Sequence, residues 1–571
     1  MPQQTIYTIT ANCQDCYHCV RECPVKAISV SGGQARVEDG LCIKCGTCIR
    51  ECPQQAKTVR SDLKEARLLL AGDRAAAASI APSFAALFPG PLSRRLPSAL
   101  RKLGFKFVCE TAEGAKYITD QSFAGPRKGG ISTACPAVVS YVEKYRPEYI
   151  EALIPVVSPM IAHGRMIKEK NPGCAVIFIG PCAAKKQEIL KPGNDSAIDA
   201  ALTFAELSEW LLAENIQVEN CSEGGFDRFY EAGEARLFPI QGGMLKTGGL
   251  HCDGTQPDIL HISGAEDVMC LFLDNPDFKG KLIEPLFCKG GCISGPCFEG
   301  KKISAVGKGL FTRRENVIRY AAQAAMENDA APPAPTISHQ AFFALDKQKQ
   351  EEVSEAQINK ILERIGRIDP ADQLDCGACG YKSCLRHVIA VARGMAELEM
   401  CLPYMRRLAQ QRTDKIIETT PHGIVILDSE LCMIQMNPAF QKMFFCSEGI
   451  MGRRISYLVN ADGFERLQAG AVEQYESIQT KYGFKYHERL YAMRDENQYV
   501  GIYSDISQIK YDAAQLDTIK AQTLMHAREF LDHQVRFAQE MAHFLGTSTA
   551  QSEAIAKSLI GLYEDDGGET P

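Results

Sequence analysis

The chain lacks three features typical of nucleic-acid-binding, membrane-spanning and secreted proteins. Its 63 Lys and Arg are fewer than its 70 Asp and Glu, and no basic region is available for nucleic acid. Its most apolar stretch, "AAAASIAPSFAALF" from Ala75, is broken by proline and too short to span a bilayer. The N-terminal "MPQQTIYTIT" has no basic region followed by an apolar one, so we expect no secretory signal and a cytoplasmic protein.

Cysteine, by contrast, is abundant, with 24 in 571 residues. Structural disulfides are rare in a reducing cytoplasm, so thiols in tight spacings there indicate metal sites. The length exceeds what one hydrophobic core supports and predicts about three to five domains. We therefore expect a multidomain α/β and α+β protein that contains several metal centres.

Residues 1–60 contain the spacing C-x2-C-x2-C-x3-C-P twice. The repeat is that of bacterial two-cluster ferredoxins, in which the fourth cysteine of each run ligates the other cluster. It predicts two 4Fe–4S clusters, one held by Cys13, Cys16, Cys19 and Cys52, the other by Cys42, Cys45, Cys48 and Cys23. Zinc is the alternative, but its motifs usually consist of two separated C-x2-C pairs. Without a substrate pocket of its own, such a module is an electron relay.

Residues 65–325 alternate helical patterns with short β-branched runs such as "CAVIFIGP" (174–181) and predict an α/β domain. Three separated cysteine motifs lie in this region: "STACP", "GPCAAKKQE" and "EPLFCKGGCISGPC". Taken singly, each is equally consistent with buried free cysteines. In this order, after a two-cluster ferredoxin, they resemble the three H-cluster motifs of the iron-iron (FeFe) hydrogenases.

The resemblance implies a cubane 4Fe–4S cluster, held by Cys135, Cys182, Cys288 and Cys292. Cys288 or Cys292, the latter being the family's bridging position, would link it to a two-iron subcluster with CO, CN⁻ and a bridging dithiolate. Lys185 would donate to a cyanide, and a buried ammonium is tolerable beside such an anion. Gly290 and Gly291, which lack a Cβ, would let the backbone approach the cluster.

Several positions depart from the family's pattern. Ala134 stands where active members have the proton-relay cysteine, and a methyl group cannot exchange protons as a thiol of pKa about 8.5 can. Gly180 and Leu286 replace the methionines that flank the two-iron unit. Ser158 is kept, but Met160 takes the place of an amide, and "KYITDQSF" (116–123) holds no glutamate for the proton exit. The metal ligands are therefore present while the usual proton route is missing.

Two interpretations of these departures stay open. One is a slow hydrogenase with another proton route, through water, Ser158 or Cys297. The other is loss of the two-iron unit, as in the hydrogenase-like iron–sulfur assembly proteins. Retention of Lys185, whose family role concerns only the cyanide, favours the first.

Residues 326–365 are predicted as a linker, proline-rich over 327–340, followed by a helix. Residues 366–403 contain C-x2-C-x4-C and a later cysteine, and resemble the single-cluster 4Fe–4S domain of some redox and corrinoid proteins. The stretch "LRHVIAVARGMAELEM" (385–400) predicts a helix that would return the last ligand to the loop, and zinc is again the alternative. The predicted ligands are Cys376, Cys379, Cys384 and Cys401.

Residues 404–510 resemble a PAS domain: a helix, the strands "GIVILD" and "CMIQMN", a helix capped by Asn437 with Pro438 at its first position, and closing antiparallel strands. No haem or flavin ligand stands out. Residues 511–571 follow, with a helical stripe at coiled-coil spacing from Asp512 to Leu545. No output module is recognisable after it, so we expect a separate signalling protein.

Together these features predict a sensory, PAS-containing iron-iron hydrogenase that splits H₂ slowly and reversibly. Its expected partners are H₂ and protons, a ferredoxin-like electron carrier, H-cluster maturation factors and a second copy joined through the PAS domain and last helix. No nucleic acid and no membrane are expected. The alternatives are a metabolic, ferredoxin-dependent hydrogenase whose PAS domain only dimerises it, and a non-catalytic iron–sulfur protein.

Overall fold

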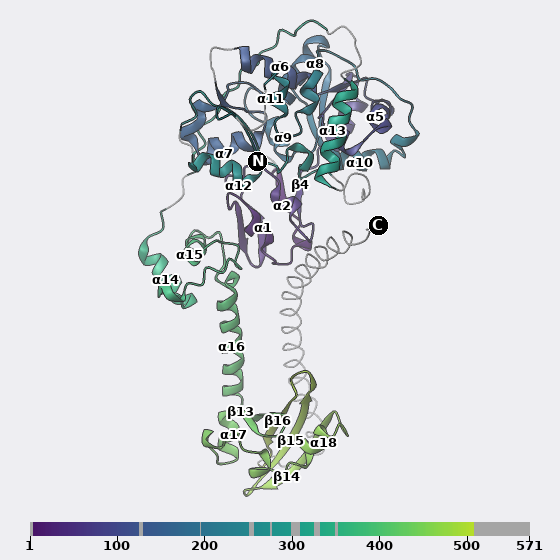
Figure 1. The fold of residues 1–571 in the computed structure, drawn as a ribbon. Coiled ribbons are helices and arrows are strands. Elements are labelled where there is room, and N and C mark those ends of the chain that lie inside the picture. The colour runs from purple at the N-terminus through teal and green to yellow at the C-terminus, as the bar shows by residue number, and fades with distance from the viewer. Residues whose placement is uncertain are drawn as a thin grey trace, which may run out of the picture. The chain divides into compact units, whose positions relative to one another are not determined.

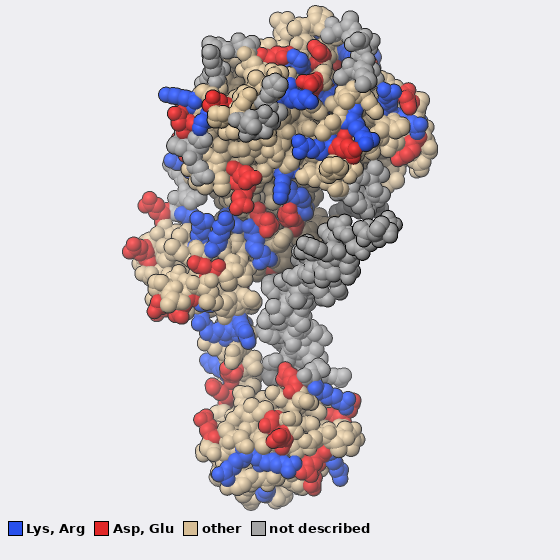
Figure 2. All heavy atoms as spheres, in the orientation of Figure 1, with Lys and Arg blue, Asp and Glu red and all other residues tan. Residues whose placement is uncertain are grey.

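The computed structural model describes residues 4–124, 129–194, 196–250, 256–274, 277–298, 309–324, 332–348 and 352–507. They fall into two compact units, Met1–Cys401 and Leu402–Pro571. Figure 1 draws the elements of both units, and Figure 2 shows Lys and Arg interspersed with Asp and Glu over the visible face of each. None of the helices in the described ranges is long and apolar enough to cross a bilayer.

The N-terminal module consists of two antiparallel strand pairs and two short helices. Strand β1 (Ile6–Thr8) pairs with β4 (Lys57–Val59), and β2 (Ile28–Ser31) pairs with β3 (Gln34–Val37). Each C-x2-C run leads into a helix, α1 (His18–Glu22) or α2 (Thr47–Arg50). The apolar core of this small module is built around its cysteines.

The α/β region contains two parallel sheets. The first, in the order β6-β5-β8-β9, comprises β5 (Ala76–Ile80), β6 (Phe107–Glu110), β8 (Ala175–Gly180) and β9 (Ala200–Thr203). The second, in the order β10-β11-β7, comprises β7 (Gly130–Ile131), β10 (Ile259–Ser263) and β11 (Leu282–Leu286). Strand β8 is buried along its whole length, which explains the continuous apolar run in the sequence.

Helices surround both sheets (Figure 1). They are α3 (Leu63–Ala71), α4 (Phe84–Leu87), α5 (Pro91–Lys102), α6 (Ala112–Ala124), α7 (Pro136–Tyr145), α8 (Pro159–Lys170), α9 (Ala183–Glu188), α10 (Phe204–Ala213), α11 (Gly243–Thr247), α12 (Ala265–Asp274) and α13 (Leu310–Ala324).

The described part of the predicted linker, residues 332–348, packs on the α/β domain. The Tyr117 hydroxyl donates to the Ile337 carbonyl (3.0 Å), and the Val157 amide donates to the His339 carbonyl (2.8 Å). Val156 and Gln340 form an antiparallel bridge. The described backbone of this segment thus has fixed hydrogen-bond partners, which its proline content did not indicate.

A small domain follows, with α14 (Glu355–Ile365) and α15 (Cys384–Ala392). The helix after Cys384 is shorter than the sequence predicts, because the chain turns at Gly394, whose φ is +68°. A 3₁₀ turn, η7 (Leu398–Met400), then leads to Cys401.

The second unit begins with α16 (Leu402–Thr419), followed by what we call the C-terminal sheet domain, residues 420–507. Its antiparallel sheet, in the order β13-β12-β16-β15-β14, contains β12 (Gly423–Leu427), β13 (Met433–Met436), β14 (Gln474–Lys481), β15 (Phe484–Met493) and β16 (Gln498–Asp505). Helices α17 (Pro438–Met443) and α18 (Asp462–Gln468) accompany the sheet. Asn437 caps α17, its side chain accepting from the Phe440 amide. The predicted helix from Asp512 to Leu545 lies outside the described residues.

Candidate functional site

Cysteines from the three motifs follow the carboxyl ends of strands in the two parallel sheets. Cys182 follows β8 and is the N-cap of α9. Cys135 is the N-cap of α7, four residues after β7, and Cys288 lies two residues beyond β11. The carboxyl edge of a parallel sheet is where sites usually form. The thiols that act electrostatically on one another there are those of Cys135, Cys182, Cys288 and Cys292.

The donor set of this site suits a metal cluster. Burial raises the pKa of the Cys182 thiol to about 11 and raises those of Cys288 and Cys292 further. A bound metal would deprotonate such thiols. A 4Fe–4S cube binds four thiolates, each through a separate iron, and the four thiols that act on one another here supply that number. The residues present therefore fit a cubane cluster.

Lys185 lies on α9, within electrostatic reach of Cys182 and Cys292. Its Nζ donates to Glu188 Oε2 at 2.7 Å, and both side chains are almost completely buried. A buried ammonium with this partner is already compensated. Burial of Lys185 therefore needs no cyanide to explain it, and its retention is weaker support for the two-iron unit than the sequence suggested.

The positions that depart from the family's pattern have the following places. Ala134 is half-buried, immediately before Cys135. Gly180 ends β8, where a Cβ would lie 2.6 Å from the Phe178 ring, and Leu286 is buried at the end of β11. Ser158 is the N-cap residue of α8, and its buried Oγ has no hydrogen-bond partner in the described structure.

A buried carboxyl group that the sequence did not single out lies on β11. Glu284 is 2% exposed, and its carboxyl oxygens accept hydrogen bonds from the backbone amides of Met244 (3.2 Å) and Leu245 (3.3 Å). Burial raises its pKa to about 8, and its charge acts on Cys292. A single acidic residue within the apolar run "KLIEPLF" was the available signal, because an acidic residue in a buried strand requires specific partners.

A close backbone contact within the α/β domain requires glycine at position 291. Its φ is +105°, and a Cβ would lie 2.3 Å from the Pro239 carbonyl oxygen. Gly291 also bridges Ile240 in antiparallel fashion. The structure thus gives a local reason for this glycine, different from the close approach to a cluster that the sequence suggested.

The remaining cysteines that the sequence singles out gather in three groups. Cys19 is electrostatically coupled to Cys13, Cys16 and Cys52, whereas Cys48 is coupled to Cys42, Cys45 and Cys23. Cys379 is coupled to Cys376 and Cys401, and Cys384 begins α15. The first two groups follow the exchange of fourth cysteines that the repeat predicts. That iron occupies them stays a prediction.

Contacts join the N-terminal module to both of its neighbours in the first unit. Cys45 acts electrostatically on Cys288, and a Cβ on Gly46 would lie 2.3 Å from Pro296. On the other side, Tyr381 is coupled to both Cys379 and Cys23. The module therefore lies between the α/β cysteine site and the small cysteine domain.

Comparison with known families agrees with these groups. The profile described as "Iron only hydrogenase large subunit, C-terminal domain" matches residues 74–296. The chain carries a domain of the iron-only hydrogenase family. A 4Fe–4S dicluster profile matches residues 5–66, and an Fe–S cluster profile matches residues 372–403.

Individual relatives include two kinds of protein from this hydrogenase-like group. Over an alignment of 259 positions the chain is 25% identical to the periplasmic [Fe] hydrogenase large subunit of Nitratidesulfovibrio vulgaris, covering 35% of this chain and 61% of that protein. Over 81 residues the chain is 32% identical to the cytosolic Fe–S cluster assembly factor NAR1 of Kluyveromyces lactis, covering 14% of this chain and 17% of that one. The matched segments thus span less than two thirds of either relative.

Among solved structures, an [FeFe]-hydrogenase HydA1 from Chlamydomonas reinhardtii is matched over 51% of this chain and all of that chain, at 16% identity and a TM-score of 0.36. A PAS domain of an HTR-like protein from Haloarcula marismortui is matched over 18% of this chain, at 18% identity and a TM-score of 0.16.

Proposed function

We propose that the protein is a sensory iron-iron hydrogenase that binds H₂ and splits it slowly and reversibly. The observation that supports this most is the gathering of Cys135, Cys182, Cys288 and Cys292 beside Lys185, with Ala134 in the place of the proton-relay cysteine. When bound, the two-iron subcluster would supply the chemistry that converts H₂ into two protons and two electrons.

The residues of the chain would hold and surround that group. The four thiolates would bind the cubane, with Cys292 in the bridging position, and Lys185 would donate to a cyanide while Glu188 keeps its ammonium paired. Gly180 and Leu286 would flank the two-iron unit. Ala134 has no exchangeable proton, so protons would leave by a slower route, which accounts for low turnover.

Electrons would leave through the N-terminal module towards a ferredoxin-like carrier. One cysteine group of this module faces both neighbouring sites, namely Cys42, Cys45, Cys48 and Cys23. Cys45 acts on Cys288 of the α/β domain, and Cys23 acts on Tyr381 of the small domain. Lys26 Nζ donates to the carbonyls of Val20 (2.8 Å) and Gly380 (2.9 Å), and fixes the second contact. The cluster of the small domain would thus exchange electrons with this group.

The output would pass from the small domain to the C-terminal unit. Cys401 is followed directly by α16, which leads into β12 of the C-terminal sheet domain. The strand order and the Asn437 cap support our interpretation of this domain as PAS. We further propose that the chain dimerises through this domain and residues 511–571 and acts on a separate signalling protein.

Infrared spectroscopy of the matured protein under H₂ tests the proposal. CO and CN⁻ bands that respond to H₂ are expected, and their absence from protein with fully assembled 4Fe–4S clusters would refute it. Ala134→Cys should then raise H₂ evolution, since a well-placed proton donor contributes about 10²–10⁴-fold. An unchanged rate at equal cluster content would mean that proton transfer at this position does not limit turnover.

A second function, that of a non-catalytic iron–sulfur protein, is favoured by two observations. The NAR1 similarity links this chain to an assembly factor, and Glu188 compensates Lys185 without any cyanide. For such a protein the CO and CN⁻ bands would be absent after maturation, while the 4Fe–4S clusters would be present. The same spectrum therefore separates the two functions.

A further inference from the structure

The interior of the C-terminal sheet domain holds polar side chains in adjacent positions. Ser477 on β14, Glu488 on β15 and Tyr503 on β16 are register partners across three neighbouring strands. Tyr486 lies two residues before Glu488 and pairs with Gln479 in the next row. All five alternate with residues of the opposite face, so these two rows line the same face of the sheet.

Two of these deeply buried side chains each have one polar atom without a hydrogen-bond partner. Glu488 is 2% exposed and Tyr503 is fully buried. Glu488 accepts from the Ser477 hydroxyl at 2.7 Å, but neither Glu488 Oε2 nor the Tyr503 hydroxyl has a partner in the described structure. Unpaired buried polar atoms are costly, and in a native protein each calls for a partner such as water or a ligand.

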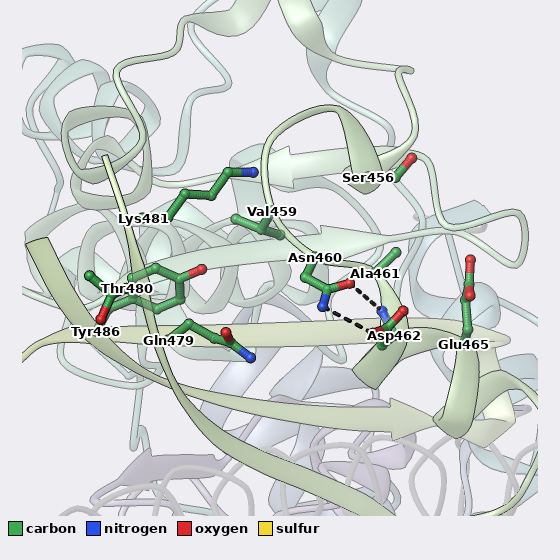
Figure 3. A pocket seen from close by; sticks show the side chains of 10 residues that line it. All are labelled: Ser456, Val459, Asn460, Ala461, Asp462, Glu465, Gln479, Thr480, Lys481 and Tyr486. Atoms are coloured by element: carbon green, nitrogen blue, oxygen red, sulfur yellow. Dashed lines mark hydrogen bonds between the residues drawn. The ribbon is translucent and has the colours of Figure 1, made fainter. Parts of the chain in front are cut away.

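A pocket of about 430 Å³ opens next to these rows. Figure 3 shows Gln479, Lys481 and Tyr486 on one side and Asp462 and Glu465 on the other. Gln479 links the wall to the interior, because its Nε2 donates to the Ser477 hydroxyl (2.9 Å), which in turn donates to Glu488. Glu488 and Tyr503 lie behind this lining, and Gln479 also acts on the Glu488 carboxyl by hydrogen bonding, so a head group could reach that carboxyl only where the Gln479 side chain turns away.

The charges of the pocket favour a cation. Asp462 and Glu465 are exposed carboxylates in its lining, of which Glu465 forms a long surface ion pair with Arg454 (3.8 Å), and Glu488 adds a third acidic group beneath. The Lys481 ammonium is turned to the Leu458 carbonyl, to which it donates at 2.6 Å. Phe444 lies against Tyr503 and Tyr486, with ring centroids 5.1 and 5.3 Å away, and keeps the inner end of low polarity. A charge-assisted hydrogen bond is strong in such surroundings.

We propose that this pocket binds a small organic cation, with an ammonium or guanidinium head group that donates to Glu488 and the Tyr503 hydroxyl. The pocket volume suits a small molecule. This site uses residues of the C-terminal sheet domain alone, so it does not depend on hydrogen chemistry in the other unit.

Saturation-transfer NMR on the full chain tests the site with methylguanidinium as the probe. Methylurea, which has nearly the same shape and no charge, is the matched control ligand. Methylguanidinium should bind and methylurea should not. Glu488→Gln should weaken binding about tenfold or more, since a hydrogen bond to a charged group is lost. Glu473→Gln, at an exposed carboxylate of the same domain, should leave binding unchanged.

The proposal would be overturned if the unaltered chain bound both probes equally or bound neither. Water would then be the partner of the buried polar atoms. Unchanged methylguanidinium affinity in Glu488→Gln would also overturn it. Should that variant fail to fold, Tyr503→Phe removes the second acceptor with little change in volume, and undiminished affinity there would be equally decisive. None of these results bears on the infrared test.

Discussion

Gly46 lies where the N-terminal module meets the α/β domain, and its replacement by alanine should disturb that contact. Its backbone is left-handed, with φ +76° and ψ 7°. A Cβ would lie 2.3 Å from Pro296 Cγ and 2.7 Å from Pro296 Cβ. The left-handed conformation costs about 1–2 kcal/mol for alanine. Overlap with a rigid proline ring adds about 1–3 kcal/mol, so the total is about 2–5 kcal/mol.

Two measurements on cluster-reconstituted Gly46→Ala check this estimate. Thermal denaturation should show a lower midpoint, and electron paramagnetic resonance of the reduced protein should show weaker magnetic interaction between the clusters on the two sides. Gly40→Ala is the matched control, because a Cβ there meets nothing within 4 Å. If the two variants behave alike, the tight contact at Pro296 is not what holds the module in place.

Two further predictions concern buried charges of the α/β domain. Glu188→Gln leaves the Lys185 ammonium without its carboxylate and should destabilise protein lacking the two-iron unit by about 3 kcal/mol in denaturant unfolding. The loss should be smaller after maturation, and an equal loss would speak against a cyanide contact. Folded Glu284 holds a proton that the unfolded chain releases above pH 4.5, so native stability should fall as pH rises from about 4.5 to about 8. Glu284→Gln should make native stability depend less on pH, which hydrogen exchange of the β11 amides between pH 5 and 8 would measure. An unchanged pH dependence of stability would contradict the raised pKa.

Local sequence patterns predicted the features that depend on neighbouring residues. The apolar run at 174–181 became the buried strand β8, and Asn437 caps its helix as expected. Strand β14 was not predicted, because its alternation of half-buried and exposed residues includes only one strongly apolar side chain, Ile478. The helix after Cys384 was predicted too long. The helical pattern continues past Gly394, and whether a glycine inside such a pattern ends the helix is decided by tertiary packing.

Contacts between distant parts of the chain could not be predicted from the sequence. The Lys185–Glu188 pair is three residues apart on one helix and could have been found from spacing alone. Glu284, in contrast, is held by amides forty residues earlier, and Gly46 is constrained by Pro296. Such contacts depend on how separate sheets and modules pack, and no pattern within a short window records them.

Cys401 and α16 are consecutive in the chain, with no loop between a predicted iron ligand and the first turn of an eighteen-residue helix. Oxygen damage that removed iron from this thiol would thereby release the anchored start of the helix. Under the proposed function, a protein damaged in this way would pass no signal to its C-terminal half, so it would stop responding instead of reporting hydrogen falsely.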